Sequence, residues 1–359
     1  MLTTTCTLRS ALFISALPAP LLGIVVAPVR RLVVALLALP SLAWVVAPMR
    51  RRLVVALLAL PSLAWAKILG AAFLPHGDFA FDPSLVRFQN GSSQLHDAAV
   101  AVGARLAALE PDIILLSTPH GESADVPFLF LDASAARAKA TIGLDLDRDC
   151  AKGCYEATLP VDEIVIAANA TRDAVSRLRA DGHRVAALSA FADTEPAPLR
   201  WGELIPLSFL NATLNATSLV VLGQPTRRQT DEVAMVPELL ALGAALFSHF
   251  DALEASVLVV VSGDLAHTHL ASGPYGYSAA AAPFDDALGA WARTLAAGPL
   301  LDDATALADD AKSCGYTGAV MLHGLLSASA ATYAPRLFAE AAPTYYGMMI
   351  ADFLPAAAQ

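Results

Sequence analysis

The hydrophobic positions from residue 67 onward follow two alternating patterns. Short apolar runs, such as ILGAAFLP, DIILLSTP and VLVVVSGD, lie between longer segments whose apolar residues recur at helical spacing. Short apolar runs bounded by small residues or proline are typical of buried parallel strands. Strands that alternate with helices are typical of a sheet covered on both faces. The pattern therefore predicts an α/β fold with a mainly parallel central sheet and helices on both faces.

Further segments complete the predicted order of elements. Helices are predicted over residues 96–110, 161–182, 231–253, 285–298 and 302–330. Strands are predicted over residues 128–134, 183–190, 218–223 and 345–354. Residues 202–214 are predicted to form a loop that enters an apolar segment. Because no Pro/Gly/Ser-rich linker interrupts these elements, the sequence indicates a single domain.

The segment before residue 67 is a duplicated hydrophobic leader. The sequence VVAPVRRLVVALLALPSLAW is repeated almost unchanged, and the second copy begins near Met49 with three arginines and ends in Ala-Trp-Ala at Ala66. A basic start, an apolar stretch and a small-x-small end are typical of a secretory signal peptide. We therefore expect residues 1–66 to be a leader with a signal peptide at 49–66, followed by a mature domain over 67–359. A retained membrane hairpin or signal anchor is the alternative, and only then would the protein contact a membrane.

Possible glycosylation sites and a cysteine pair agree with a secreted protein or one in the secretory-pathway lumen. Asn-x-Ser/Thr triplets begin at Asn90, Asn169, Asn211 and Asn215. Cys150 and Cys154 flank a short polar loop and can form a local disulfide, with a metal-binding pair as the alternative. Cys314 then remains as an odd thiol in the mature chain.

The charge of the chain argues against one class of partner. The formal net charge is −10, and the basic runs are confined to the leader. Proteins that bind nucleic acid usually carry a basic patch or stripe. Nucleic-acid binding is therefore not expected.

Three histidines each lie just after a predicted strand. His76 follows ILGAAFLP, His120 follows DIILLSTP, and His267 follows VLVVVSGDLA. Ligands of open α/β sheets bind beyond the carboxyl ends of the strands. Imidazole is a common ligand of transition metals and the usual general acid or base near neutral pH. Each histidine alone can be a buried, hydrogen-bonded residue, but their matching positions predict one shared site.

Several short motifs occur in a fixed order along residues 67–355. They are PHGD, STPHG, GELIPLSFL, VVLGQPTRR, SGDLAH, GPYGYSAAAAPFDD and SCGYTGAVMLHGLL. Their order and spacing resemble the catalytic domain of class III extradiol ring-cleavage dioxygenases. The most specific part is SGDLAH followed by GPYGY and FDD.

The resemblance implies an Fe(II)-dependent enzyme that adds O2 to a catechol-type substrate and so opens its ring. His76 and His120 match the two imidazole ligands, and His267 matches the acid/base that moves a proton. His269, two residues further on, is the second choice for that role. Asp264 either orients His267 or caps the helix or turn after the strand. Two imidazoles and one carboxylate leave open positions on the iron for the catechol oxygens and O2.

Two positions depart from the family pattern. Relatives often carry an Asp-His pair where this chain has Arg200 and Trp201. The carboxylate ligand is expected near Cys314, where no Glu occurs, so Cys314, or an aspartate such as Asp310, is expected to complete the site.

Memo-type proteins, which are similar to this family but are not established ring-cleavage enzymes, place a cysteine at the position of Cys314. A thiolate ligand would suit zinc or copper as well as iron. The alternative function is therefore a Memo-like metal-binding protein without dioxygenase activity, and a metal-free interaction module of the same fold is a third possibility. The expected partners are a small aromatic substrate and O2, while a homo-oligomer remains open.

Overall fold

The computed structural model describes residues 67–82, 92–142, 155–189 and 195–356, which fall in one compact unit. The predicted leader, the Cys150–Cys154 pair and Asn90 lie outside the described residues. Among the described residues, no helix is both long and apolar enough to cross a membrane.

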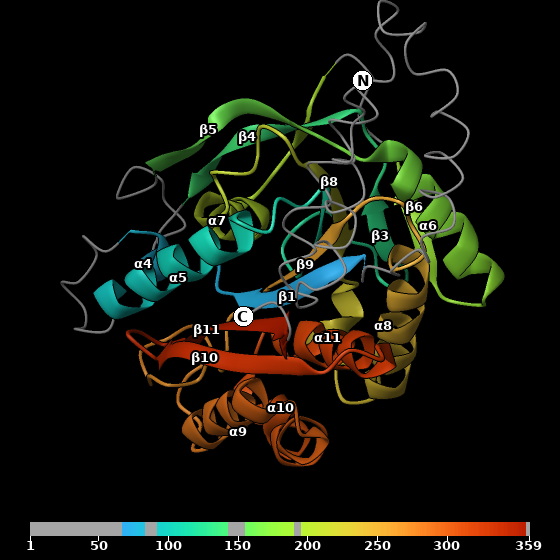
Figure 1. Cartoon of the computed structure of the whole chain (residues 1–359). Coiled ribbons are helices and arrows are strands. Elements are labelled where there is room, and N and C mark those ends of the chain that lie inside the picture. Colours follow the sequence, from blue (N-terminus) through green and yellow to red (C-terminus); the bar gives the residue numbers. More distant parts are fainter. Residues whose placement is uncertain (1–66, 83–91, 143–154, 190–194, 357–359) are drawn as a thin grey trace, which may run out of the picture. The chain divides into compact units, whose positions relative to one another are not determined.

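The centre of the structure is a mixed, mostly parallel eight-stranded sheet in the order β10-β11-β1-β9-β2-β8-β3-β6 (Figure 1). Its strands are β1 (Ile68–Leu74), β2 (Ile113–Thr118), β3 (Phe128–Leu131), β6 (Val185–Leu188), β8 (Ser218–Gly223), β9 (Val257–Ser262), β10 (Tyr333–Ala341) and β11 (Met348–Pro355). The pairs β1–β9, β9–β2, β2–β8 and β3–β6 are parallel, whereas β3–β8, β1–β11 and β10–β11 are antiparallel. The predicted α/β fold is confirmed.

Alternate side chains of the central strands enter two separate hydrophobic cores. Along β9, Val259 and Val261 belong to one core, and Leu258 and Val260 belong to the other. The first core is covered by α6 (Ala168–Ala180), α8 (Val236–Phe250), α9 (Ala281–Thr294) and α11 (Tyr316–Ala328). The second is covered by α5 (Ser92–Ala107), α7 (Trp201–Phe209) and a small sheet. Because both faces are apolar, the central strands are nearly continuous hydrophobic runs.

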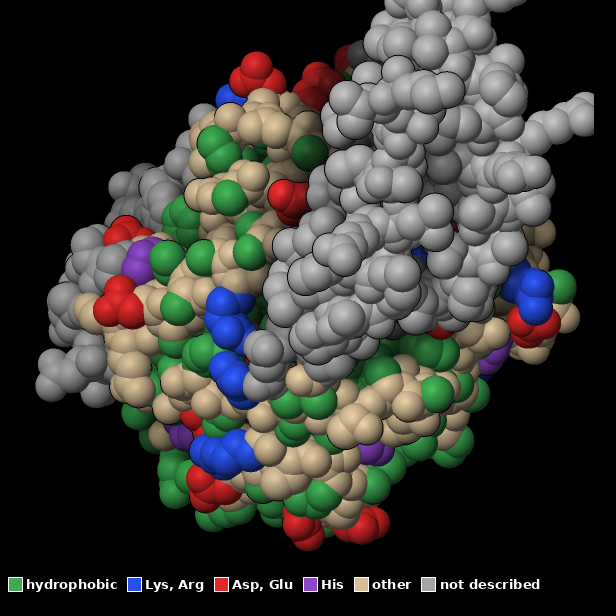
Figure 2. All heavy atoms as spheres, in the orientation of Figure 1, with side chains coloured by type: hydrophobic (Ala, Val, Ile, Leu, Met, Phe, Trp, Pro, Cys, Tyr) green, Lys and Arg blue, Asp and Glu red, His purple; other side chains and the backbone are tan. Residues whose placement is uncertain are grey.

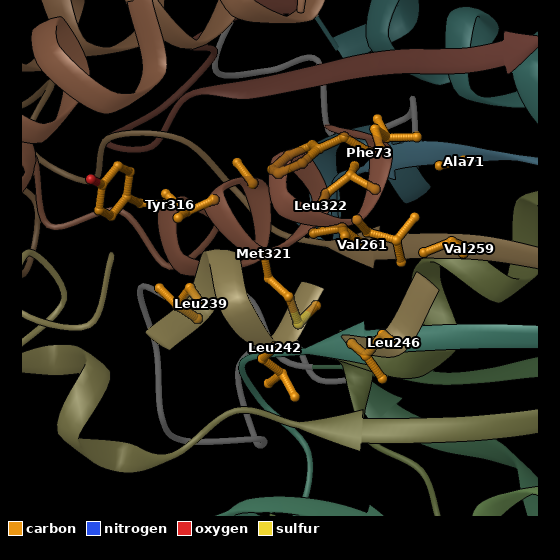
Figure 3. Close-up of a cluster of buried hydrophobic side chains, with 14 of the residues drawn as sticks. Ala71, Phe73, Leu239, Leu242, Leu246, Val259, Val261, Tyr316, Met321 and Leu322 are labelled. Atoms are coloured by element: carbon orange, nitrogen blue, oxygen red, sulfur yellow. The ribbon is translucent and has the colours of Figure 1, made fainter. Parts of the chain in front are cut away.

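In the first core, α11 packs against both the sheet and α8. Figure 3 shows Met321 and Leu322 of α11 beside Val261 of β9, with Leu239 and Leu242 of α8 on the other side. This packing fixes the start of α11 at Tyr316, two residues after Cys314.

The small sheet corrects the prediction of one helix over 161–182. Its strands are β4 (Ala135–Ile142), β5 (Tyr155–Val165) and β7 (Ala197–Pro198). Ile164 is buried while Val165 is 62% exposed, and this alternation belongs to a strand with one covered face. The helix begins only at Ala168, so its first seven predicted residues were wrong.

The region predicted as a loop at 202–214 contains the helix α7. The carboxylate Oε2 of Glu203 accepts the backbone N–H of Arg200 at 2.7 Å, which supports the first turn. Pro206 lies inside the helix and has no N–H to donate to the carbonyl four residues earlier, that of Gly202. The hydroxyl of Ser262 donates to the Gly202 carbonyl instead. Because Pro206 cannot donate to it, the Gly202 carbonyl is free to accept a hydrogen bond from Ser262, the last residue of β9.

The predicted helix over 302–330 is interrupted before Cys314. The segment forms η5 (Pro299–Ala304), η6 (Thr305–Leu307) and α10 (Ala308–Ala311), and α11 starts after the break. Lys312 has φ 56°, which ends α10 in a left-handed turn. A Cβ on Gly315 would lie 2.8 Å from the carbonyl oxygen of Asp264. Only glycine allows this approach, which brings Cys314 against the loop after β9.

The remaining short elements are α4 (Asp78–Phe81) and η4 (Thr226–Gln229). Figure 2 shows one face of the molecule, where acidic and basic side chains both occur among hydrophobic ones.

Candidate metal centre

Three neighbouring parallel strands bring the candidate side chains to one edge of the sheet. His76 follows the end of β1 at Leu74, and His120 follows the end of β2 at Thr118. Asp264 stands at the same distance after the end of β9, which lies between β1 and β2. Because parallel strands share their carboxyl edge, these three positions converge.

Two overlapping groups of ligand atoms meet at this edge. His76, His120 and Cys314 each offer one ligand atom, and the three atoms lie within 4.8 Å of one another. Asp264, His267 and Cys314 form a second such group, so the thiol belongs to both. His76 Nε2 lies 3.3 Å from Cys314 Sγ, and the rings of His76 and His120 are 4.6 Å apart. The structure thus contains a buried His/His/Cys/Asp group that can hold a metal ion.

A chain of hydrogen bonds fixes the orientation of His76. Its Nδ1 lies 2.8 Å from Ser262 Oγ. Since the Ser262 hydroxyl gives its proton to the Gly202 carbonyl, Oγ accepts from His76, whose proton therefore lies on Nδ1. The lone pair on Nε2 then faces Cys314. Such a bond to the second ring nitrogen is the usual support of a metal-binding histidine.

Burial and nearby positive charge keep the imidazoles neutral. Burial lowers the pKa of His76 well below its usual value, and His120 and His267 add to the effect. Burial, and then the guanidinium of Arg228, lowers the pKa of His120 to about 3 and that of His267 to about 4. Metal ligation needs the neutral imidazole. At neutral pH these three imidazoles are therefore in the neutral form that binds a metal.

Asp264 is the acidic side chain that the structure places at the centre. Its Oδ1 accepts the backbone N–H of His76 at 3.2 Å, and its Oδ2 lies 3.4 Å from His76 Nε2. Its backbone N–H donates to Cys314 Sγ at 3.3 Å. In the described stretch between β9 and Ala281 no helix begins, so Asp264 caps no helix there, whereas a role in the turn after β9 stays a prediction.

Asp310 is not brought into the group. It is exposed on α10, and its backbone carbonyl accepts the hydroxyl of Thr268. Cys314 and Asp310 were the two candidates for the third metal ligand. Of these, the structure places Cys314 beside His76 and His120. Sequence reasoning gave Asp264 no ligand role, although its position after β9 matches those of His76 and His120 after their strands.

The two loop histidines face different partners. His269 Nε2 lies 2.7 Å from Asp285 Oδ2, and Asp285 Oδ1 accepts the N–H of Ala266 at 2.8 Å. This pair anchors the loop after β9 and lies outside both ligand groups. The His267 ring lies parallel to Tyr275 at 5.7 Å. His267, and not the alternative His269, is the loop histidine at the centre.

The donor set fits a divalent transition metal. Two neutral imidazoles and one thiol are the ligand types of zinc sites, and they also bind iron and copper. His76, Asp264 and Cys314 are buried, whereas His120 and His267 are partly exposed. An ion held here would therefore be enclosed by protein on the side of the buried ligands and accessible to solvent on the other side.

The chain was compared with known proteins by sequence and by structure. A scan against models of known families and a search of curated proteins gave no match. Among solved structures, the chain is similar to an uncharacterized protein, JW3007 from Escherichia coli K12, at 14% sequence identity and a TM-score of 0.47. The alignment covers 79% of this chain and 99% of that chain.

Proposed function

We propose that this protein is a metal-dependent enzyme of the extradiol type, which binds Fe(II) and adds O2 to a catechol-type substrate. The observation that carries the proposal is the convergence of His76, His120 and Cys314 within 4.8 Å at the carboxyl edge of the sheet. The bound metal would supply positions where the two catechol oxygens and O2 meet. The chain's own residues would hold the ion and leave one side open.

His267 is the side chain proposed to move the proton. Its imidazole is neutral at neutral pH, so a ring nitrogen can accept a proton from a catechol hydroxyl. Its ring lies among Tyr275, Tyr345 and Tyr346, at centroid distances of 5.7, 5.9 and 5.9 Å. These rings lie around the imidazole and would offer apolar faces to an aromatic substrate.

A second candidate is a Memo-like metal-binding protein without dioxygenase activity. The observation that favours it is the second ligand group, in which His267 and Asp264 approach the same thiol. In that arrangement His267 is a third imidazole ligand, and fewer positions remain for substrate and O2. A thiolate with three imidazoles suits zinc or copper at least as well as iron.

One pair of measurements separates the candidates. The full chain is loaded with Fe(II) without oxygen, its metal content is measured, and catechol and air are then added while absorbance of a ring-opened product is followed. The dioxygenase proposal expects His267→Ala to keep its iron and lose about 10²–10⁴-fold in turnover, the usual effect of removing a general acid or base. Loss of iron in this variant, with no turnover in the wild type, would favour the Memo-like candidate.

Secretion remains part of the proposal. Asn169, Asn211 and Asn215, the three described sequon asparagines, are all exposed and so accessible to glycosylation. Expression in a secreting eukaryotic cell should give a mature chain that starts at Lys67. A chain retained in the membrane with its leader would contradict this.

A further inference from the structure

Lys67, which directly precedes β1, is held through its backbone nitrogen by a carboxylate from a distant part of the chain. The Lys67 nitrogen donates to Asp251 Oδ1 at 3.0 Å, and the nitrogen of Ile68 donates to the same oxygen at 3.2 Å. The Lys67 carbonyl accepts the N–H of Val257, the first residue of β9, at 2.6 Å. Lys67 is therefore fixed at both of its backbone polar groups, and its nitrogen faces a carboxylate.

Asp251 stands where an acidic side chain is unfavourable for its helix. It is the residue that follows the carboxyl end of α8, a helix of 15 residues. The last carbonyls of a helix carry partial negative charge, which favours a cation there and opposes a carboxylate. Among the described residues, no cation forms an ion pair with Asp251. Two neutral N–H groups thus bind an oxygen whose surroundings favour a positive charge.

A second carboxylate beside the start of β1 uses the one cation that the structure places there. Glu254 Oε2 lies 3.6 Å from Lys67 Nζ, which also donates to the Glu254 carbonyl at 3.2 Å. The Lys67 side chain therefore pairs with Glu254 and leaves the charge of Asp251 unbalanced. One further positive charge, at the Lys67 backbone nitrogen, would balance it.

Removal of the leader would create a positive charge at this atom. Hydrolysis of the peptide bond before Lys67 by a signal peptidase consumes one water, whose hydroxyl goes to the Ala66 carbonyl carbon and whose other hydrogen goes to the Lys67 nitrogen. The new acid then loses a proton, and the new amine gains one at neutral pH. The ammonium has three N–H donors in place of one. A hydrogen bond between two ionised groups is also roughly twice as strong as a neutral one.

We propose that Asp251, at the carboxyl end of α8, forms a binding site for the α-ammonium of Lys67 that cleavage of the leader creates. The nitrogen that cleavage frees already lies at hydrogen-bond distance from Oδ1, so the site needs no rearrangement. Processing then stabilises the start of β1, the strand that leads to His76. The cleavage rests on the secretion proposed above, whereas the binding site rests on the geometry of Asp251.

Unfolding of the secreted protein tests the site. The full chain with its leader is expressed in a secreting eukaryotic cell, and the N-terminus of the product is sequenced. Urea unfolding is then compared for the wild type, for Asp251→Asn, for a chain with one alanine inserted between Ala66 and Lys67, and for the combination of both changes. The inserted alanine moves the ammonium one residue away and leaves an amide nitrogen at Lys67.

The wild type should lose more from the aspartate substitution than the chain with the inserted alanine does. A hydrogen-bonded charge pair corresponds to about 10- to 100-fold in an equilibrium constant, so Asp251→Asn should lower the folding constant of the wild type by that factor. In the chain with the inserted alanine the loss should be clearly smaller, since Asn keeps an acceptor for the amide. The control is Glu254→Gln, which should change the folding constant little, because the Glu254 side chain is fully exposed.

The outcomes separate the binding site from the cleavage. Equal losses from Asp251→Asn with and without the inserted alanine would overturn the site and leave secretion standing. Equal stability of the wild type and the chain with the inserted alanine would also overturn it, and this comparison needs no change at Asp251. A product that does not start at Lys67 would overturn both the cleavage and the site, because no ammonium would then reach Asp251.

Discussion

The two imidazoles proposed to bind the metal are held in different ways. His76 is 3% exposed, and its ring and backbone contact Ser262, Asp264 and Cys314. His120 is partly exposed; its backbone N–H donates to Thr118 at 3.3 Å, and its ring lies against Trp201. His76 therefore belongs to a rigid polar network, and His120 to the side that a ligand can reach. We infer that one side of the centre fixes the ion and the other admits the substrate.

Alanine variants of the two histidines should show this difference most strongly. His76→Ala and His120→Ala should both bind far less than one equivalent of metal, because each loses one of three proposed protein ligands. Without metal, His76→Ala should also be less stable by about 1–3 kcal/mol, since buried partners lose their hydrogen bonds. His120→Ala should lose clearly less. Metal content by mass spectrometry and urea unfolding of the metal-free proteins measure both effects. Equal losses of stability in the two variants would contradict the proposed difference between His76 and His120.

Replacing Cys314 tests the thiol that both ligand groups share. Cys314→Ala should lose most of its metal, whereas Asp310→Ala should bind as the wild type does, because Asp310 is exposed and outside the groups. The two variants are compared by competition with a chromophoric zinc chelator. If Asp310→Ala lost metal and Cys314→Ala did not, the ligand assignment would be wrong.

A buried carboxyl behind the His120 loop should make stability depend on pH. Burial raises the pKa of Glu203 from 4.5 to about 7, and a Cβ on Gly121, next to His120, would lie 2.2 Å from its Oε1. The folded state therefore holds this proton over a pH range in which the unfolded chain releases it, so stability falls as pH rises from about 4.5 to 7. The full change is about 3 kcal/mol.

The matched variant for this prediction is Glu203→Gln, which keeps an oxygen for the Arg200 N–H. It should unfold with less pH dependence than the wild type over that interval, in urea titrations at several pH values. An unchanged slope would show that Glu203 is not the titrating group.

The smallest effect is expected from the residue that supports His76 from behind. Ser262→Ala removes the acceptor for the Nδ1 proton and should weaken metal binding by about 10- to 100-fold, the usual effect of losing a supporting partner. The control is Thr268→Ala, which removes a hydroxyl from the loop after β9 that bonds to α10 and not to His76, and it should change affinity little. Similar losses in both variants would mean that the loop, and not the tautomer of His76, determines the affinity.

The sequence predicted the parts of the site that depend on strand position. His76, His120 and His267 were found because a buried apolar strand precedes each one, and the carboxyl edge of a parallel sheet gathers such residues. Cys314 followed from the resemblance to Memo-type proteins. Its contact with His76, 238 residues away, depends on the break after α10 and the close approach at Gly315.

The parts that were wrong depend on contacts between distant segments. His269 pairs with Asp285, sixteen residues further along the chain, and therefore lies outside the ligand groups. No local sequence pattern indicates this pairing. The segment of α7 was predicted as a loop, whereas the helix accommodates Pro206 because Ser262 from β9 supplies the hydrogen bond that the proline cannot make. The edge strand β10 was not predicted, since most of its side chains are only partly buried and give no clear alternation.

The most direct test of the central claim is the ligand set of the bound metal. X-ray absorption at the zinc edge of the zinc-loaded full chain reports which atoms bind the ion. We expect one sulfur at about 2.3 Å together with two or three imidazole nitrogens at about 2.0–2.1 Å. His120→Ala should lower the imidazole contribution, and Cys314→Ala should remove the sulfur. A wild-type spectrum with no sulfur ligand, or with oxygen ligands alone, would contradict the proposed centre.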